Sequence, residues 1–155
     1  MEASTSNLNS APCFIFGMST RLEERLERIL RVIENLAREA AMGVPIIVEG
    51  VKDLKALNRL NVKGDILLAK ASGKTFLGLL GEIEERGKPE VILLLDFDRR
   101  GREWTKLLVE NLERNKIKPN ITYWRELRSL AGREVKDIEG LSKCVETLKR
   151  KVNRD

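Results

Sequence analysis

The chain contains no histidine and only two cysteines, Cys13 and Cys144, among its 155 residues. A zinc site built from cysteine and histidine is therefore excluded, and so is every mechanism that needs an imidazole base. The two cysteines have no metal-ligand spacing, and a disulfide between them is not expected in a cytoplasmic protein. No apolar run approaches the roughly 18–20 residues that cross a bilayer, so we expect a soluble, cytoplasmic protein without a membrane segment.

The charge is moderately basic, with 29 Lys and Arg residues, 24 Asp and Glu residues, and a net charge of +5. Such a surface attracts polyanions, of which nucleic acid is the commonest. The alternative is an ordinary solvated surface with a slight basic bias. Nucleic acid, either RNA or DNA, is therefore a candidate partner. The charge alone does not establish it, and the sequence motifs have to provide further support.

The start of the chain differs from the rest. Residues 1–17 are polar and lack periodicity, so we expect either a disordered tail or a wrongly assigned start, with Met18 as the true initiator. Residues 18–155 are expected to form a single domain. Apolar residues recur at helical spacing over 20–42, which predicts a long N-terminal helix that ends at Gly43.

The rest of the chain alternates short apolar runs with amphipathic segments. Continuous apolar runs indicate strands that are covered on both faces, at 45–50, 65–70, 91–96 and, more weakly, 120–124. Helical patterns lie near 52–61, 73–86, 101–116 and 138–151. The alternation predicts an α/β, Rossmann-like domain: about four strands in a mainly parallel sheet, helices on both faces, and the extra N-terminal helix.

Three carboxylates stand where two of the predicted strands end. Glu49 follows the first strand, and Asp96 and Asp98 follow the third. In a parallel sheet these ends meet at one edge, where the acids repel one another unless a cation neutralises them. Oxygen ligands favour Mg²⁺ or Mn²⁺. Gly50 and Gly101 are expected to let the chain turn sharply into the next helix. The alternative is that each acid caps a helix or pairs with an arginine.

These motifs resemble the Toprim domain, whose marks are a Glu-Gly pair after one strand and a D-x-D after a later strand. The segments Val48–Asp53 (VEGVKD) and Asp96–Gly101 (DFDRRG) carry the resemblance, which covers roughly residues 44–125. The pattern is most similar to the small stand-alone Toprim proteins of archaea, which are similar to ribonuclease M5.

The resemblance implies a role for each acid. Glu49 would be the general acid/base or a metal ligand, and Asp96 and Asp98 would hold Mg²⁺. Asp53 would be either a group behind the ligands or the acidic charge that a helix start favours. Some topoisomerases carry a third acid two residues beyond the D-x-D, whereas this chain has Arg100 there.

Several other residues have two interpretations. Lys70, Arg99 and Arg100 are candidates for phosphate contact, and the alternative is that they are simply exposed. Tyr123 and Trp124 are expected to pack in the core rather than to stack on bases. The acids of the segment 136–141, Asp137 among them, are interpreted as a helix start, with a place at the rim of the site as the alternative.

Three functions compete. The leading hypothesis is a Mg²⁺-dependent phosphoryl-transfer protein acting on RNA or DNA, and a nuclease is the favoured activity. The second is a non-catalytic Toprim module that binds nucleic acid or a protein partner in replication, repair or RNA processing. The third is a structural subunit, in which the helix over 20–42 docks on a protein partner or on a second copy in a homodimer.

Overall fold

The computed structural model describes residues 17–71 and 73–153. Its centre is a sheet of four parallel strands in the order β2-β1-β3-β4. The strands are β1 Ile46–Val48, β2 Ile66–Leu68, β3 Glu90–Leu93 and β4 Lys118–Asn120. The predicted α/β class and the four-stranded parallel sheet are therefore confirmed.

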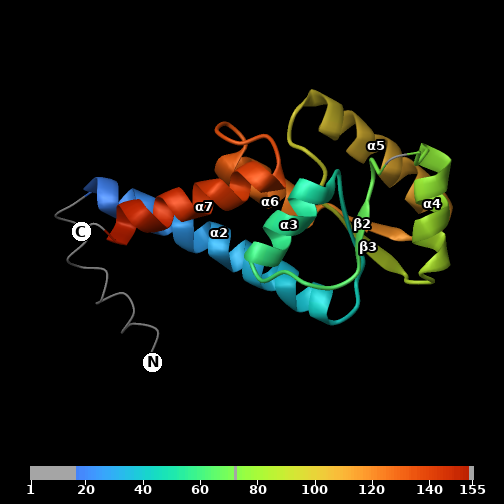
Figure 1. Cartoon of the computed structure of the whole chain (residues 1–155), viewed down its shortest axis with the longest axis horizontal. Coiled ribbons are helices and arrows are strands. Elements are labelled where there is room, and N and C mark those ends of the chain that lie inside the picture. The colour runs from blue at the N-terminus through green and yellow to red at the C-terminus, as the bar shows by residue number, and fades with distance from the viewer. Residues whose placement is uncertain (1–16, 72, 154–155) are drawn as a thin grey trace.

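Helices cover both faces of the sheet (Figure 1). The helices are α2 Gly17–Ala41, α3 Val51–Arg59, α4 Phe76–Glu85, α5 Arg99–Arg114, α6 Thr122–Ala131 and α7 Ile138–Asn153. The long helix α2 runs beside α7 and also contacts α6 (Figure 1). Its apolar side, including Ile29 and Leu36, is fully buried inside the chain. None of the helices in the described part has a stretch that is long and apolar enough to cross a membrane.

The sheet separates two apolar cores because side chains alternate between the two faces of a strand. In β1, Ile46 and Val48 face the core shared with α2, α3, α6 and α7, whereas Ile47 faces the core shared with α4 and α5. All three side chains are fully buried. Each contributes about 1.5–3 kcal/mol by burial. This is the physical reason for the continuous apolar runs in the sequence.

The fourth predicted strand was placed wrongly. Its range, 120–124, belongs mostly to the helix α6, and the strand β4 lies earlier, at Lys118–Asn120. Asn120 ends the strand, because its side-chain oxygen accepts the N–H of Thr122 at 2.9 Å. Within α6 the buried residues are Tyr123, Trp124, Leu127 and Ala131, a spacing typical of an amphipathic helix. The sequence interpretation missed this helix.

The other elements agree with the predicted ranges to within a few residues at each end. The segment predicted at 101–116 begins earlier, at Arg99, because Asp98 caps it. The segment predicted at 73–86 begins at Phe76, because the Thr75 hydroxyl accepts the N–H of Gly78 at 3.0 Å. Residues 1–16 lie outside the described residues, so the prediction of a tail or a wrong start remains a prediction.

Candidate metal centre

The acids gather at the carboxyl ends of the neighbouring strands β1 and β3. Glu49 follows β1 directly, and Asp96 lies in the segment that joins β3 to α5. In α/β proteins with an open parallel sheet, this edge is where ligands bind. Glu49 and Asp96 therefore lie at the sheet edge where the sequence placed them.

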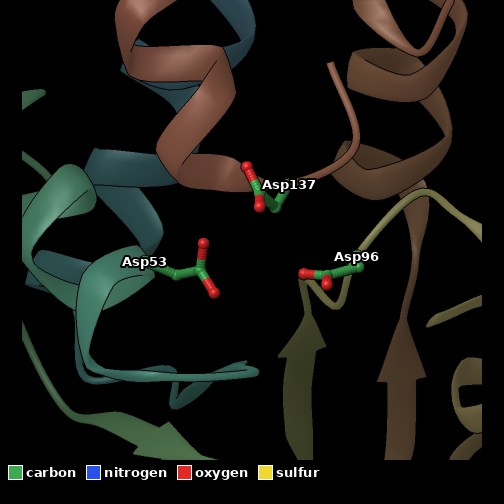
Figure 2. Close-up of side chains that lie close together, drawn as sticks. All are labelled: Asp53, Asp96 and Asp137. Carbon is green, nitrogen blue, oxygen red and sulfur yellow. The ribbon is translucent and has the colours of Figure 1, made fainter.

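Three carboxylates converge there from three separate segments (Figure 2). Asp53 comes from the first turn of α3, Asp96 from the segment after β3, and Asp137 from the segment before α7. One carboxylate oxygen of each residue lies within 4.8 Å of the corresponding oxygens of the other two. We refer to these three residues as the carboxylate cluster.

Backbone hydrogen bonds hold the segment that carries Asp137 against the sheet edge. The N–H of Phe97 donates to the carbonyl of Lys136 at 2.6 Å, and the N–H of Glu139 donates to Asp53 Oδ1 at 3.1 Å. Asp137 also caps α7, because its Oδ1 accepts the N–H of Gly140 at 2.7 Å. Asp137 therefore both caps a helix and lies in the site, so its two alternative interpretations apply together.

Glu49 is buried beside the cluster, with 7% of its surface exposed. Its Oε2 accepts the backbone N–H of Asp96 at 3.2 Å, and its Oε1 pairs with Lys70 Nζ at 2.7 Å. The ammonium of Lys70 also lies 5.5 Å from the ring centroid of Trp104. Lys70, predicted to contact phosphate, is therefore occupied by Glu49 in this structure.

Asp53 lies at the helix start that was one of its two predicted roles, and its carboxylate belongs to the cluster itself rather than to a group behind it. It lies in the first turn of α3, where its Oδ2 accepts the N–H of Gly50 at 3.3 Å, and it also points into the cluster (Figure 2). The chain bends at Gly50 on its way into α3, as expected, but the bend does not require glycine. Its φ of −145° is extended backbone, open to any residue, and no atom lies within 4 Å of a Cβ built there.

The D-x-D motif divides its two acids between two tasks. Asp98 is exposed and caps α5, because its Oδ1 accepts the N–H of Gly101 at 2.9 Å. It is not one of the three residues of the cluster. Gly101 also differs from expectation, because it lies inside the first turn of α5 and does not make the turn itself. A Cβ at this position would stand 2.0 Å from the carbonyl oxygen of Asp96, so only glycine fits there.

The arginines beside the motif are exposed. Arg99 pairs with Glu103 at 3.2 Å within α5, and Arg100 makes no ion pair with any of the residues described. Tyr123 and Trp124 are buried as predicted. The indole N–H of Trp124 donates to the carbonyl of Leu95 at 2.8 Å, just before Asp96.

Burial and mutual repulsion perturb the acids. Desolvation, together with the charges of Glu49, Asp53, Asp137 and Asp98, raises the pKa of Asp96 to about 7. Desolvation also raises the pKa of Asp53, although the N–H groups of Glu139 and Gly50 oppose the shift. Carboxylates held this close favour a bound cation over a dehydrated negative charge. Their oxygens are the ligands that Mg²⁺ and Mn²⁺ prefer, so the residues present fit such an ion.

Comparison with known proteins gives the family. Residues 44–125 match the Toprim domain model, and this is more than half of the chain. The chain therefore belongs to the Toprim domain family, as the resemblance predicted. Toprim domains generally bind Mg²⁺. Asp137 lies beyond the matched residues, so the cluster combines two acids of the domain with one from the following segment.

Two archaeal relatives and one solved structure are similar to this chain over most of its length. A UPF0292 protein of Methanocaldococcus jannaschii is 38% identical over 122 residues, which cover 78% of this chain and 92% of the relative. A UPF0292 protein of Pyrococcus furiosus is 36% identical over 81% of this chain and 90% of the relative. A solved structure of a protein from Aquifex aeolicus has a TM-score of 0.59 and 26% identity, and the match covers 71% of this chain and 94% of that one.

Asp137 is the residue that the sequence analysis undervalued. The only local signal was an Asp with a glycine three residues later, before an amphipathic segment, which predicts a helix cap and no more. Its approach to Asp96 depends on how α7 packs, and that is a tertiary property. Short-range patterns therefore could not assign it to the site.

Proposed function

We propose that the chain is a Mg²⁺-dependent nucleic-acid phosphoryl-transfer protein, and that it is a nuclease acting on RNA or DNA. The observation that supports this most is the convergence of Asp53, Asp96 and Asp137 from three segments at the carboxyl edge of the sheet. Backbone hydrogen bonds give Asp53 and Asp137 structural roles one at a time, but they do not explain why Asp96 is held beside both at the cost of repulsion. Membership of the Toprim family supports the nucleic-acid substrate.

The acidic residues of the site are proposed to act either as metal ligands or as the general acid/base. Asp53, Asp96 and Asp137 would hold the ion, and Mn²⁺ would fit the same oxygens. When bound, Mg²⁺ would polarise the phosphate and stabilise the leaving oxygen. Glu49 is proposed as the general acid/base, and it is oriented by the Asp96 N–H and by Lys70. The proposal leaves Asp98 out of the ligands, because it is exposed and its Oδ1 caps α5, although the family resemblance predicts it as a ligand.

Phosphate contacts are proposed for the basic residues at the same edge. Arg100 is exposed and forms no ion pair in the described part of the chain. The pair between Arg99 and Glu103 is on the surface and contributes at most about 1 kcal/mol, so a phosphate can compete for that arginine. Lys70 would contact phosphate only by giving up part of its contact with Glu49.

Cleavage assays on structured RNA and on DNA, with Mg²⁺ and with a chelator, test the proposal. We expect wild-type cleavage to require the metal and Asp96→Asn to lower it by about 100-fold. Glu49→Gln should lower the rate while leaving metal binding largely intact. Glu110→Gln, an exposed acid on α5, is the charge control and should behave as wild type. Equal activity in Asp96→Asn and wild type would rule out the proposed site.

A second candidate is a non-catalytic Toprim module that binds nucleic acid or a protein partner. The contacts of Glu49 favour it, because the carboxylate proposed to carry the proton is already bound by Lys70 Nζ at 2.7 Å and by the N–H of Asp96 at 3.2 Å. Tight binding of RNA or DNA with no cleavage in Mg²⁺ or Mn²⁺, and none after Lys70→Gln, would support this candidate over the nuclease.

A further inference from the structure

Two hollows on the surface join at α6. One, of about 450 Å³, is lined by Arg102, Arg125, Arg128 and Arg133 together with Phe97. The other, of about 320 Å³, extends from Arg125 to the helix α2. Both hollows are lined by Arg125 and Ser129, so they adjoin each other on the surface, and we treat them as one depression.

We call this depression the arginine groove. Its six arginines are Arg28, Arg31, Arg102, Arg125, Arg128 and Arg133. All six are exposed, and Glu126 is the one acid among the lining residues. The groove begins beside Phe97, which directly follows Asp96, and so it leads away from the carboxylate cluster across α6.

The arginines of the groove lack carboxylate partners. Within residues 17–71 and 73–153, none of the six forms an ion pair, whereas Arg25, Arg86 and Arg99 elsewhere each pair with an acid. Six like charges along one depression repel one another, so they are maintained at a cost to the free energy of folding. An anionic partner would remove that repulsion.

The chemistry of the groove favours phosphate. Guanidinium groups grip two phosphate oxygens at once, whereas lysine acts as a point charge, and all the basic residues of the groove are arginine. Arg128 is held over the ring of Trp124, with 5.4 Å between its guanidinium carbon and the ring centroid. Val32, Leu130 and Phe97 are the large apolar residues of the lining, and the rest is mostly arginine, which favours an anionic partner.

We infer that the arginine groove binds the phosphodiester backbone of a nucleic acid and leads it past Phe97 to the carboxylate cluster. The binding stands on the groove alone, and only the statement that the strand is cut rests on the proposed function. Because the contacts are to phosphates, affinity should depend strongly on salt and little on base sequence.

The test is fluorescence anisotropy of labelled oligonucleotides with wild type and variants in a chelator, so that no metal contributes. Single-stranded RNA, single-stranded DNA and duplex DNA are separate arms. We expect Arg125→Gln with Arg133→Gln to weaken binding by about tenfold and to reduce the slope of log affinity against log salt by about one to two. Arg28→Gln with Arg31→Gln is a second variant in case the first does not fold.

The matched control is Arg59→Gln with Arg114→Gln, which removes the same charge from exposed arginines outside the groove. We expect it to change the affinity by less than about twofold. An equal loss in control and groove variants would overturn the inference, and so would an unchanged salt slope. Equally tight binding of polyglutamate would also overturn it, because the groove would then recognise negative charge rather than phosphodiesters.

The outcome is separable from that of the proposed function. If the groove variants lose binding but no protein cleaves, the groove assignment stands and the nuclease proposal fails. If the groove variants cleave with unchanged kcat/KM, the groove assignment fails and the nuclease proposal stands.

Discussion

The backbone N–H of Phe97 donates a 2.6 Å hydrogen bond to the carbonyl of Lys136. Each of these residues adjoins an acid of the carboxylate cluster, Asp96 on one side and Asp137 on the other. The bond therefore joins the segment after β3 to the segment before α7 at the point where their carboxylates meet. Packing of α7 and assembly of the site are parts of the same structural event.

Gly101 should tolerate no side chain. A Cβ there would meet the Asp96 carbonyl at 2.0 Å, so we expect Gly101→Ala to lower the free energy of unfolding by about 3 kcal/mol. It should also weaken metal binding, because Asp96 has to move. Urea denaturation and Mn²⁺ titration measure the two effects.

Gly81→Ala is the matched control for Gly101→Ala. Gly81 lies inside α4, and no atom stands within 4 Å of a Cβ built there. Alanine should therefore raise the free energy of unfolding by about 0.5–1 kcal/mol through its helix propensity. Similar effects of the two substitutions would contradict the close approach between α5 and Asp96.

The charge on Asp96 should make the metal-free protein less stable as pH rises. The native carboxyl titrates at a pKa of about 7, above the ordinary value of 3.8. Between these values the native state binds more protons than the unfolded chain. The stabilising contribution of the protonated carboxyl is thus fully present below 3.8 and is lost as pH rises through about 7.

Asp96→Asn isolates this contribution. In a chelator, the free energy of unfolding of the variant minus that of wild type should increase from about pH 5 to about pH 8. Added Mg²⁺ should make wild type more stable than the variant at the higher pH, because the ion stabilises wild type alone. A difference that does not vary with pH would mean that Asp96 titrates normally.

Trp124 should stabilise the segment that carries Asp96. Trp124→Phe keeps most of the apolar packing but leaves the Leu95 carbonyl without its donor, which should cost about 2 kcal/mol. Trp104→Phe is the control, because Trp104 is only partly buried and donates no hydrogen bond within the described residues. Unfolding followed by circular dichroism compares them, and equal losses would contradict a role for the indole N–H.

The sequence predicted those parts of the fold that rest on local patterns. Three apolar runs identified β1, β2 and β3, and the acids after β1 and β3 pointed to the sheet edge where the carboxylates gather. The helix α6 was missed because the short edge strand Lys118–Asn120 is followed at once by the apolar residues that begin the helix, so strand and helix read as one run. Neither the strand period nor the helix period is clear over so few residues.

The site was predicted less completely than the fold. Asp96 and Glu49 were placed correctly at the sheet edge, because strand ends are visible in the sequence. The sequence could not show that Asp98 caps α5 or that Asp137 joins Asp53 and Asp96. Both depend on the approach of segments far apart in the chain, which only the packed structure fixes.

Mn²⁺ binding to a set of Asp→Asn variants tests most directly whether Asp53, Asp96 and Asp137 are the metal ligands. Asparagine can cap a helix as aspartate does, so Asp137→Asn and Asp98→Asn keep their caps while each loses one charge. Titration followed by calorimetry or electron paramagnetic resonance gives the affinities. Glu110→Gln serves as the remote charge control.

If the carboxylate cluster holds the ion, Asp53→Asn, Asp96→Asn and Asp137→Asn should each weaken Mn²⁺ binding by at least about tenfold. Asp98→Asn and Glu110→Gln should each change it by less than about twofold. The assignment of the carboxylate cluster as the metal site is contradicted if Asp137→Asn binds Mn²⁺ like wild type while Asp98→Asn loses as much affinity as Asp96→Asn.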